Sequence, residues 1–201
     1  MRMIKVSHVN KELKHKNVLS DITWKFQEGN VYLLKGHNGC GKTMLLRAIC
    51  GLIHPDSGTV NCPEHTTFGI IIENPSFVEN ETAWQNLVYL AKINHVIGKE
   101  QIEDALKAVN LFQDKDKKVK TYSLGMKQRL AICQAIMENP DVLLLDEPFN
   151  ALDSENVKAV TEIILNEKKK GKIVIIAAHM IDQTLEGLFD EMITMANGKI
   201  V

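Results

Sequence analysis

The stretch VYLLKGHNGCGKTMLLRAI, residues 31–49, decides the fold predicted for this chain. A short apolar run leads into a glycine-rich segment, and residues with helical spacing follow at once. Residues 36–43 fit the pattern G-x-x-x-x-G-K-[ST], whose glycines let backbone N–H groups surround phosphate oxygens. An ordinary glycine-rich turn is the alternative. The strand before the segment and the helix after it favour a phosphate-binding loop.

All eight residues of this loop are candidate nucleotide ligands: Gly36, His37, Asn38, Gly39, Cys40, Gly41, Lys42 and Thr43. Lys42 is expected to reach the β- and γ-phosphates, and the Thr43 hydroxyl is expected to face Mg²⁺. Cys40 lies near a helix N-terminus and a lysine, which favours a reactive thiolate. We nevertheless favour a small tolerated residue over a redox switch at this position.

Short continuous apolar runs recur along the chain, as is typical of central strands in a parallel sheet. They read VYLLKG, FGIII, DVLLLDE and KIVIIAAH. MIKVSHV and DITWKF near the N-terminus instead alternate as half-buried strands do, and Asn197-Gly198 predicts a C-terminal hairpin. The sequence therefore predicts an α/β fold, a P-loop NTPase core with a mostly parallel sheet, N-terminal antiparallel β strands and an inserted helical subdomain.

The helical insertion is expected between residues 82 and 137. Thr82 and Gln85 have capping-box spacing at its start, and IEDALKAV places Ile102, Ala105, Leu106 and Val109 on one helical face. With 201 residues, of which 45% are hydrophobic, the chain can bury one core. We expect a single domain, 1–201, with a core lobe at about 1–73 and 138–201 and a helical lobe at about 74–137.

Composition excludes several classes of partner. Lys and Arg total 24 against 25 for Asp and Glu, so a net charge of -1 gives no general attraction to nucleic acid or anionic lipid. The four cysteines form no CxxC pair, which favours free thiols in a reducing cytosol. No apolar run approaches the roughly 20 residues that span a bilayer. We expect a soluble chain that binds no nucleic acid.

Two acids and a histidine end the later apolar runs. VLLLDEP delivers Asp146 and Glu147 from a buried strand, where Asp146 is expected to bind Mg²⁺ waters and Glu147 to activate an attacking water. His179 ends the next run. A lone histidine is more often structural, but the end of a strand beside the predicted phosphates favours a site residue.

The order of these motifs, with YSLGMKQRL and FNALD on either side of VLLLDEP, resembles the nucleotide-binding subunit of an ATP-binding cassette (ABC) transporter. The resemblance covers essentially the whole chain. It implies residues 36–43 as Walker A, Ser123 and Gly125 as the signature, Asp146 as the Walker B acid, Glu147 as the catalytic base, residues 150–153 with Asp153 as the D-loop, and His179 as the switch histidine.

The same resemblance implies ATP and Mg²⁺, and a second copy of the chain paired head to tail. Each ATP would lie between Walker A of one subunit and Ser123 and Gly125 of the other. A homodimer is favoured because Glu147, Ser123 and His179 are all present. The remaining partner would be an integral-membrane permease, which would hold this cytoplasmic chain at the inner face of the membrane. IIENPSF and YSLGMKQRL most resemble the branch that exports bacitracin, lantibiotics and related peptides, so the exported cargo is expected to be an antimicrobial peptide or another hydrophobic compound.

Three positions depart from the family pattern. The signature reads YSLGM in place of LSGGQ, and the Q-loop glutamine is replaced by Glu73, which we expect to contact the metal or its waters. The aromatic residue that normally stacks on adenine falls near Leu13, and His15 is the nearest ring. The alternative function is a soluble ABC ATPase in a cytosolic assembly or nucleic-acid process. A GTPase is disfavoured because no NKxD motif follows the loop.

Overall fold

The computed structural model describes residues 2–73, 76–150 and 152–201, which form two β-sheets. The larger sheet has six strands in the order β5-β6-β7-β3-β8-β9. Its strands are β3 (Val31–Lys35), β5 (Phe68–Ile71), β6 (Val142–Asp146), β7 (Ile173–Ala178), β8 (Glu191–Ala196) and β9 (Lys199–Ile200). All neighbours pair in parallel except β8 and β9. The predicted central strands and the mostly parallel sheet are confirmed.

The smaller sheet is antiparallel, in the order β2-β1-β4. β1 (Met3–Leu13) and β2 (Lys16–Gln27) contain the two predicted alternating strands. β4 (Ser57–Asn61) was not predicted, because its residues SGTVN have neither an apolar run nor a clear alternation. It becomes a strand through its pairing with β1, as Val6 faces Val60.

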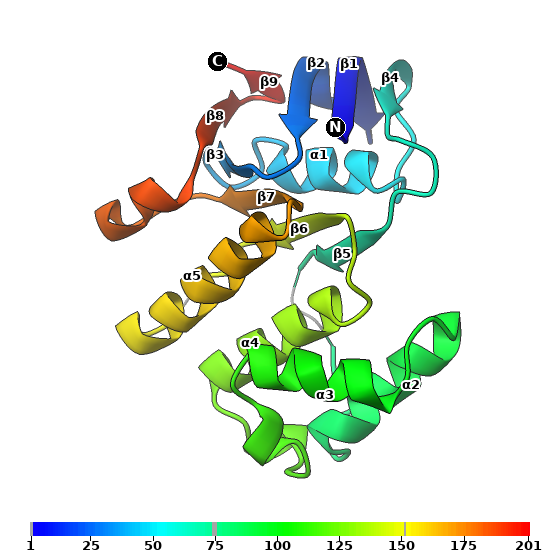
Figure 1. Ribbon diagram of the computed structural model, residues 1–201. Coiled ribbons are helices and arrows are strands. Elements are labelled where there is room, and N and C mark those ends of the chain that lie inside the picture. The colour runs from blue at the N-terminus through cyan, green and yellow to red at the C-terminus, as the bar shows by residue number, and fades with distance from the viewer. Residues whose placement is uncertain (1, 74–75, 151) are drawn as a thin grey trace.

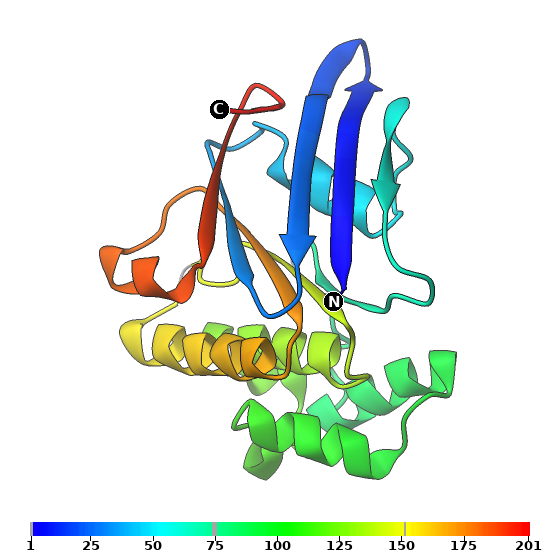
Figure 2. The ribbon, with the colours of Figure 1, turned by 45° about the horizontal axis from the view of Figure 1, so that its top comes forward.

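The first helix, α1 (Lys42–Ile49), packs between the two sheets (Figures 1 and 2). Its apolar face, with Leu45, Leu46 and Ile49, belongs to one buried cluster that also holds Ile22 of β2 and Ile175 of β7. The helix that follows the glycine-rich loop is therefore fixed on both sides. This packing holds the loop rigidly at the end of β3.

Between β5 and β6 the chain forms the predicted helical insertion (Figure 1). It contains α2 (Ala83–Asn94), α3 (Lys99–Ala108), the short 3-10 helices η1 (Phe112–Asp114) and η2 (Val119–Thr121), and α4 (Leu124–Ile136). The capping box of Thr82 and Gln85 is confirmed. The lobe boundaries at 73/74 and 137/138 stay a prediction, and Asn74 and Pro75 lie outside the described residues.

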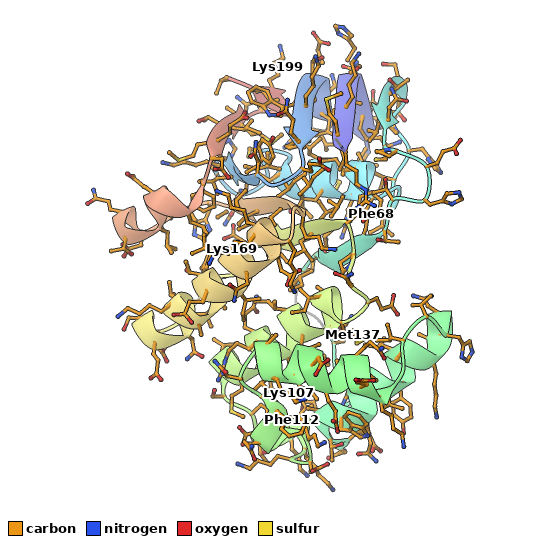
Figure 3. The ribbon with its side chains drawn as sticks, viewed as in Figure 1. Phe68, Lys107, Phe112, Met137, Lys169 and Lys199 are labelled. Atoms are coloured by element: carbon orange, nitrogen blue, oxygen red, sulfur yellow. The ribbon has the colours of Figure 1, made fainter. Side chains whose placement is uncertain are left out.

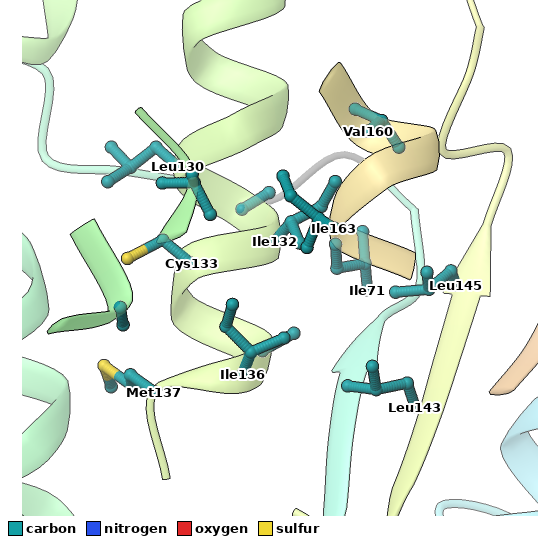
Figure 4. Packing of buried hydrophobic residues seen from close by; sticks show 14 of the residues in the cluster. Ile71, Leu130, Ile132, Cys133, Ile136, Met137, Leu143, Leu145, Val160 and Ile163 are labelled. Atoms are coloured by element: carbon teal, nitrogen blue, oxygen red, sulfur yellow. The ribbon is translucent and has the colours of Figure 1, made fainter. Parts of the chain in front are cut away.

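A second buried cluster joins these helices to the other face of the large sheet. Figure 4 shows Ile132 and Ile136 of α4 facing Leu143 of β6 and Ile71 of β5, with Ile163 of α5 (Ser154–Lys169) beside them. Because the cluster is continuous, α4 is held against the same sheet that carries the predicted acids. None of the helices in the described ranges is long and apolar enough to cross a membrane.

Cation–π contacts stabilise the far end of the insertion. The Lys115 ammonium lies 4.9 Å from the Trp84 ring centroid and 4.3 Å from that of Phe112. Lys107 lies 5.3 Å from the same Phe112 ring, and Figure 3 shows these two residues side by side below α4. The segment after α3 that contains Phe112 and Lys115 is therefore anchored to α2 and α3.

The last segment, after β7, holds the 3-10 helix η3 (Gln183–Leu188) and the β8–β9 hairpin. Asn197 and Gly198 form the hairpin turn, with φ of 49° and 76°. The predicted Asn-Gly hairpin is confirmed. Its Gly198 N–H donates to the Cys40 carbonyl at 2.9 Å, so the C-terminal hairpin supports the glycine-rich loop.

Candidate nucleotide-binding site

The glycine-rich loop is confined by the backbone of its neighbours. A methyl group at Gly36 would lie 2.3 Å from the Met195 carbonyl oxygen, and one at Gly41 would lie 2.6 Å from that of Val18. Gly41 also has a φ of 113°, which L side chains rarely adopt. Cys40 is 1% exposed beneath the loop, which agrees with the small tolerated residue that we favoured over a redox switch.

Lys42 begins α1 and is only 5% exposed. Its ammonium donates to the carbonyls of Gly36 at 2.7 Å and His37 at 3.3 Å. Among the residues that the structure describes, no carboxylate forms an ion pair with it. A buried cation without an anion is costly, so the loop is suited to bind an anionic group such as phosphate.

Thr43 and Asp146 meet although they are far apart in the sequence. The Thr43 hydroxyl donates to Asp146 Oδ2 at 2.7 Å, which joins the start of α1 to the end of β6. Burial raises the pKa of Asp146, the charges of Glu147 and Glu73 raise it further, and the Thr43 hydrogen bond opposes the shift. The nearby Lys42 charge also opposes the shift, so burial is its main cause.

Glu147 directly follows Asp146 and is held by His179 from the end of β7. The backbone N–H and the Nδ1–H of His179 both donate to Glu147 Oε1, at 3.0 Å and 2.9 Å. Glu147 has a φ of 50°, an uncommon conformation for a glutamate. Within the described ranges its Oε2 forms no hydrogen bond to the protein, so this oxygen is available to a water molecule.

Glu73 follows β5 and pairs with Arg47 in the last turn of α1. Its side chain is 69% exposed, and its charge reaches Asp146. No group of three or more His, Cys, Asp and Glu side chains in the described part could hold a metal ion. Contact between Glu73 and a metal therefore stays a prediction. The sequence analysis missed Arg47, whose only signal was a basic residue at the C-terminal end of a predicted helix.

The predicted adenine position lies in the β1–β2 turn. Leu13 pairs with Lys16, which leaves Lys14 and His15 as a two-residue turn with φ of 49° and 62°. The His15 side chain is fully exposed at 102%. Its Nδ1 lies 3.6 Å from Glu12 Oε1, and whether the ring stacks on a base stays a prediction.

Ser123 and Gly125 lie at the start of α4, away from the glycine-rich loop. Ser123 caps the helix by accepting the Met126 N–H at 3.2 Å, and among the described residues no hydrogen bond joins it to residues 36–43. In the part of the chain that the structure describes, the Ser123 hydroxyl donates no hydrogen bond, so its proton is available to a ligand. This placement agrees with a group that serves a nucleotide other than the one at its own loop, and the role itself stays a prediction.

Tyr122, the first residue of the predicted signature, anchors this turn and allows a test of stability. Its hydroxyl donates to the Asp114 carbonyl at 2.8 Å, and burial raises the pKa of Tyr122 to about 12. We expect Y122F to lower the free energy of unfolding at pH 7 by about 1 kcal/mol, the value of a typical hydrogen bond.

The pH dependence of this effect has a defined sign. Because the folded pKa of Tyr122 lies above its unfolded value, the neutral phenol stabilises the fold fully below about pH 10, and this stabilisation is lost as the pH rises toward about 12. Denaturant titrations at pH 7, 10 and 11.5 should show that the difference in free energy of unfolding between the wild type and Y122F decreases as the pH rises. A constant difference would contradict the assignment.

Asp153 caps α5, and both of its carboxylate oxygens bind Asn156. This capping role was not expected from the sequence. Whether Asp153 also contacts nucleotide stays a prediction. Of the predicted D-loop, Ala151 lies outside the described residues, and Asn150 donates its N–H to the Glu147 carbonyl at 3.1 Å. The sequence analysis missed Asn156, since a polar residue in the first turn of a helix carries no distinguishing pattern.

A parallel sheet with a phosphate-binding loop, a Thr–Asp pair and a Glu–His pair at one edge defines a P-loop nucleoside triphosphatase. The family model described as ABC transporter matches residues 19–150. The chain is 41% identical over 207 residues to the uncharacterized ABC transporter ATP-binding protein YybJ of Bacillus subtilis (strain 168), covering 98% of this chain and 94% of YybJ.

Two further comparisons agree. The bacitracin transport ATP-binding protein BcrA of Enterococcus faecalis is 35% identical, over 99% of this chain and 68% of BcrA. The dimeric structure of MJ0796, a bacterial ABC transporter cassette, matches the fold with a TM-score of 0.85 at 23% identity, over 98% of this chain and 96% of that one. The chain belongs to the ABC transporter ATP-binding family, whose cassettes bind and hydrolyse ATP.

Proposed function

We propose that the chain hydrolyses Mg-ATP as a homodimer and thereby drives export through a separate membrane permease. The observation that carries this proposal is the Glu147–His179 pair, with a contact of 2.9 Å, placed directly after Asp146 and its Thr43 partner. A water-activating base and a cation-binding pair at one strand end are what phosphoryl transfer to water requires.

The residues present fit Mg²⁺ only together with phosphate oxygens. Thr43 and Asp146 supply the hydroxyl and carboxylate oxygens that Mg²⁺ prefers as ligands. Glu73 would act through metal-bound water. When bound, Mg²⁺ would neutralise charge on the phosphate oxygens.

Hydrolysis would proceed by attack of water on the γ-phosphorus. Glu147 would accept the proton of the water at Oε2 as the new P–O bond forms and the bond to the β-phosphate breaks. His179 fixes Glu147 through its Nδ1–H and backbone N–H. Lys42 would hold the β- and γ-phosphates through the donor capacity that its two carbonyl contacts leave unused.

Pairing of two chains would complete each site. Ser123 and the Gly125 N–H at the start of α4 would donate to the γ-phosphate bound by the other subunit. The MJ0796 cassette was solved as a dimer, which supports this arrangement. ATP would favour the closed pair because these contacts require a γ-phosphate, and ADP lacks it.

An apolar groove beside the site is suited to hold the permease. A cavity of about 650 Å³ lies between β5, α2 and α4, and an adjacent cavity contains both Arg47 and Glu73. Ile93 and Val96 on the rim of the first cavity are 71% and 67% exposed. Exposed apolar residues gathered at a groove support an interaction site there. A permease segment in the groove would lie next to Glu73, whose partner Arg47 belongs to the helix of the phosphate-binding loop.

The double variant I93D/V96D tests this docking. Coexpressed with a candidate permease that recruits the wild type, it should be recovered with membranes at least about 10-fold less than the wild type, since two buried charges without partners cost several kcal/mol. ATP binding should be unchanged. V201D, at an equally exposed apolar residue, serves as the control. Equal membrane recovery of I93D/V96D and wild type would contradict the docking site.

The relatives support a proposal for the cargo class. The bacitracin transport protein covers nearly all of this chain, so we propose a peptide antibiotic or similar hydrophobic compound as the exported substrate. The chain would then act in the cytoplasm, at the inner face of the membrane. Failure of the wild type itself to reach membranes with any neighbouring permease would favour a soluble assembly ATPase instead.

A further inference from the structure

Gly125 and Asn156 occupy one space where α4 and α5 begin. Gly125 is buried, and a methyl group there would lie 2.3 Å from Cγ, 2.4 Å from Oδ1 and 2.5 Å from Nδ2 of Asn156. Three nearly equal distances mean that the carboxamide lies flat across the missing side chain. Any residue other than glycine at position 125 must therefore displace Asn156.

Asn156 is not free to move aside. Its Nδ2 donates to both oxygens of Asp153, at 2.9 Å and 3.0 Å, and its backbone N–H donates to Asp153 Oδ1 at 2.8 Å. The hydrogen bonds from Asn156 and, to a smaller extent, the charge of Arg129 on α4 hold the pKa of Asp153 below its usual range. Asp153 is thus an ionised acceptor at neutral pH, and the carboxamide is fixed in its plane.

We propose that Asn156 is a positioning residue that fixes the signature turn, residues 123–125, against the cap of α5 in the same chain. Packing within its own chain then requires glycine at position 125, because the Asn156 carboxamide takes the place of a side chain there. The contact joins an insertion helix to the helix that follows β6, so it sets the spacing of two turns that would both face the partner's nucleotide. This functional consequence rests on the proposed ATP-dependent pairing, whereas the packing claim does not.

The alternative explanation for Gly125 is that the γ-phosphate of the nucleotide bound by the other subunit must approach its backbone. A double-mutant cycle separates the two explanations. G125A should lower the thermal midpoint of the nucleotide-free protein by about 3–10 °C, as overpacking does in proteins of this size. In G125A/N156A the colliding carboxamide is gone, and most of that loss should be recovered.

The control for the cycle is G187A, because a methyl group at Gly187 meets no atom within 4 Å. G187A alone should leave the midpoint nearly unchanged, and G187A/N156A should show the sum of the single effects. If the losses of G125A and N156A also add, Asn156 is not the reason for glycine at position 125, and the proposal is overturned. This outcome is decided without nucleotide, so it stands whether or not the chain hydrolyses ATP.

A second measurement separates positioning from general stability. N156A should bind ATP as a monomer with wild-type affinity, yet its ATP-dependent self-association should weaken about 10-fold, because the two turns lose their fixed spacing. N156D, which keeps the shape but places two carboxylates together, should behave like N156A or worse. Unchanged association of N156A would show a purely structural contact and overturn the positioning role. If wild type itself fails to associate with ATP, the proposed function fails while the thermal cycle still holds.

Discussion

K42M is expected to weaken ATP binding about 10- to 100-fold, the range that one or two charge-assisted hydrogen bonds contribute. Lys42 is 5% exposed at the start of α1, and its ammonium has only carbonyl partners, at 2.7 Å and 3.3 Å. Methionine fills a similar volume and removes a buried charge, so the thermal midpoint without nucleotide should stay within about 3 °C of the wild type. Titration with a fluorescent ATP analogue measures the binding.

A matched control is K199M, which removes an exposed lysine of the C-terminal hairpin. It should bind ATP like the wild type. K42M with unchanged ATP affinity would mean that the phosphates lie elsewhere, and the site built on the loop would be wrong.

E147Q is expected to lower kcat for ATP hydrolysis at least about 100-fold, since a general base contributes 10²- to 10⁴-fold. Glutamine retains an oxygen that can accept from His179, so the turn at the end of β6 should keep its geometry. ATP binding should therefore persist. E191Q, at an exposed glutamate of β8, should hydrolyse ATP at the wild-type rate. Hydrolysis by E147Q within a few-fold of the wild type would assign the base to another residue.

Much of the fold could be predicted because its central strands carry a local signal. Apolar runs such as Val31–Lys35 and Ile173–Ala178 are buried on both faces and read as strands without any neighbour. β4 could not be predicted, since Ser57–Asn61 is mostly exposed and becomes a strand only by pairing with β1. A strand formed by partner pairing leaves little pattern in its own residues.

In the candidate site, too, residues with a local sequence signal were predicted and residues defined by a tertiary contact were missed. Thr43, Asp146, Glu147 and His179 were expected at one sheet edge, because parallel strands deliver their ends to the same side, and the structure brings them together in two hydrogen-bonded pairs. Arg47 and Asn156 were missed. Each is an ordinary polar helix residue, and its role depends on a partner about 26 or 31 positions away, Glu73 or Gly125, that only the tertiary structure supplies.

The most direct test of ATP-dependent pairing is the mass of E147Q in solution, measured by light scattering during gel filtration with ATP and with ADP. A composite site between two chains predicts a dimer with ATP and a monomer with ADP, because only ATP offers a γ-phosphate to Ser123 and Gly125 of the partner. E147Q that binds ATP yet stays a monomer at every protein concentration would contradict it.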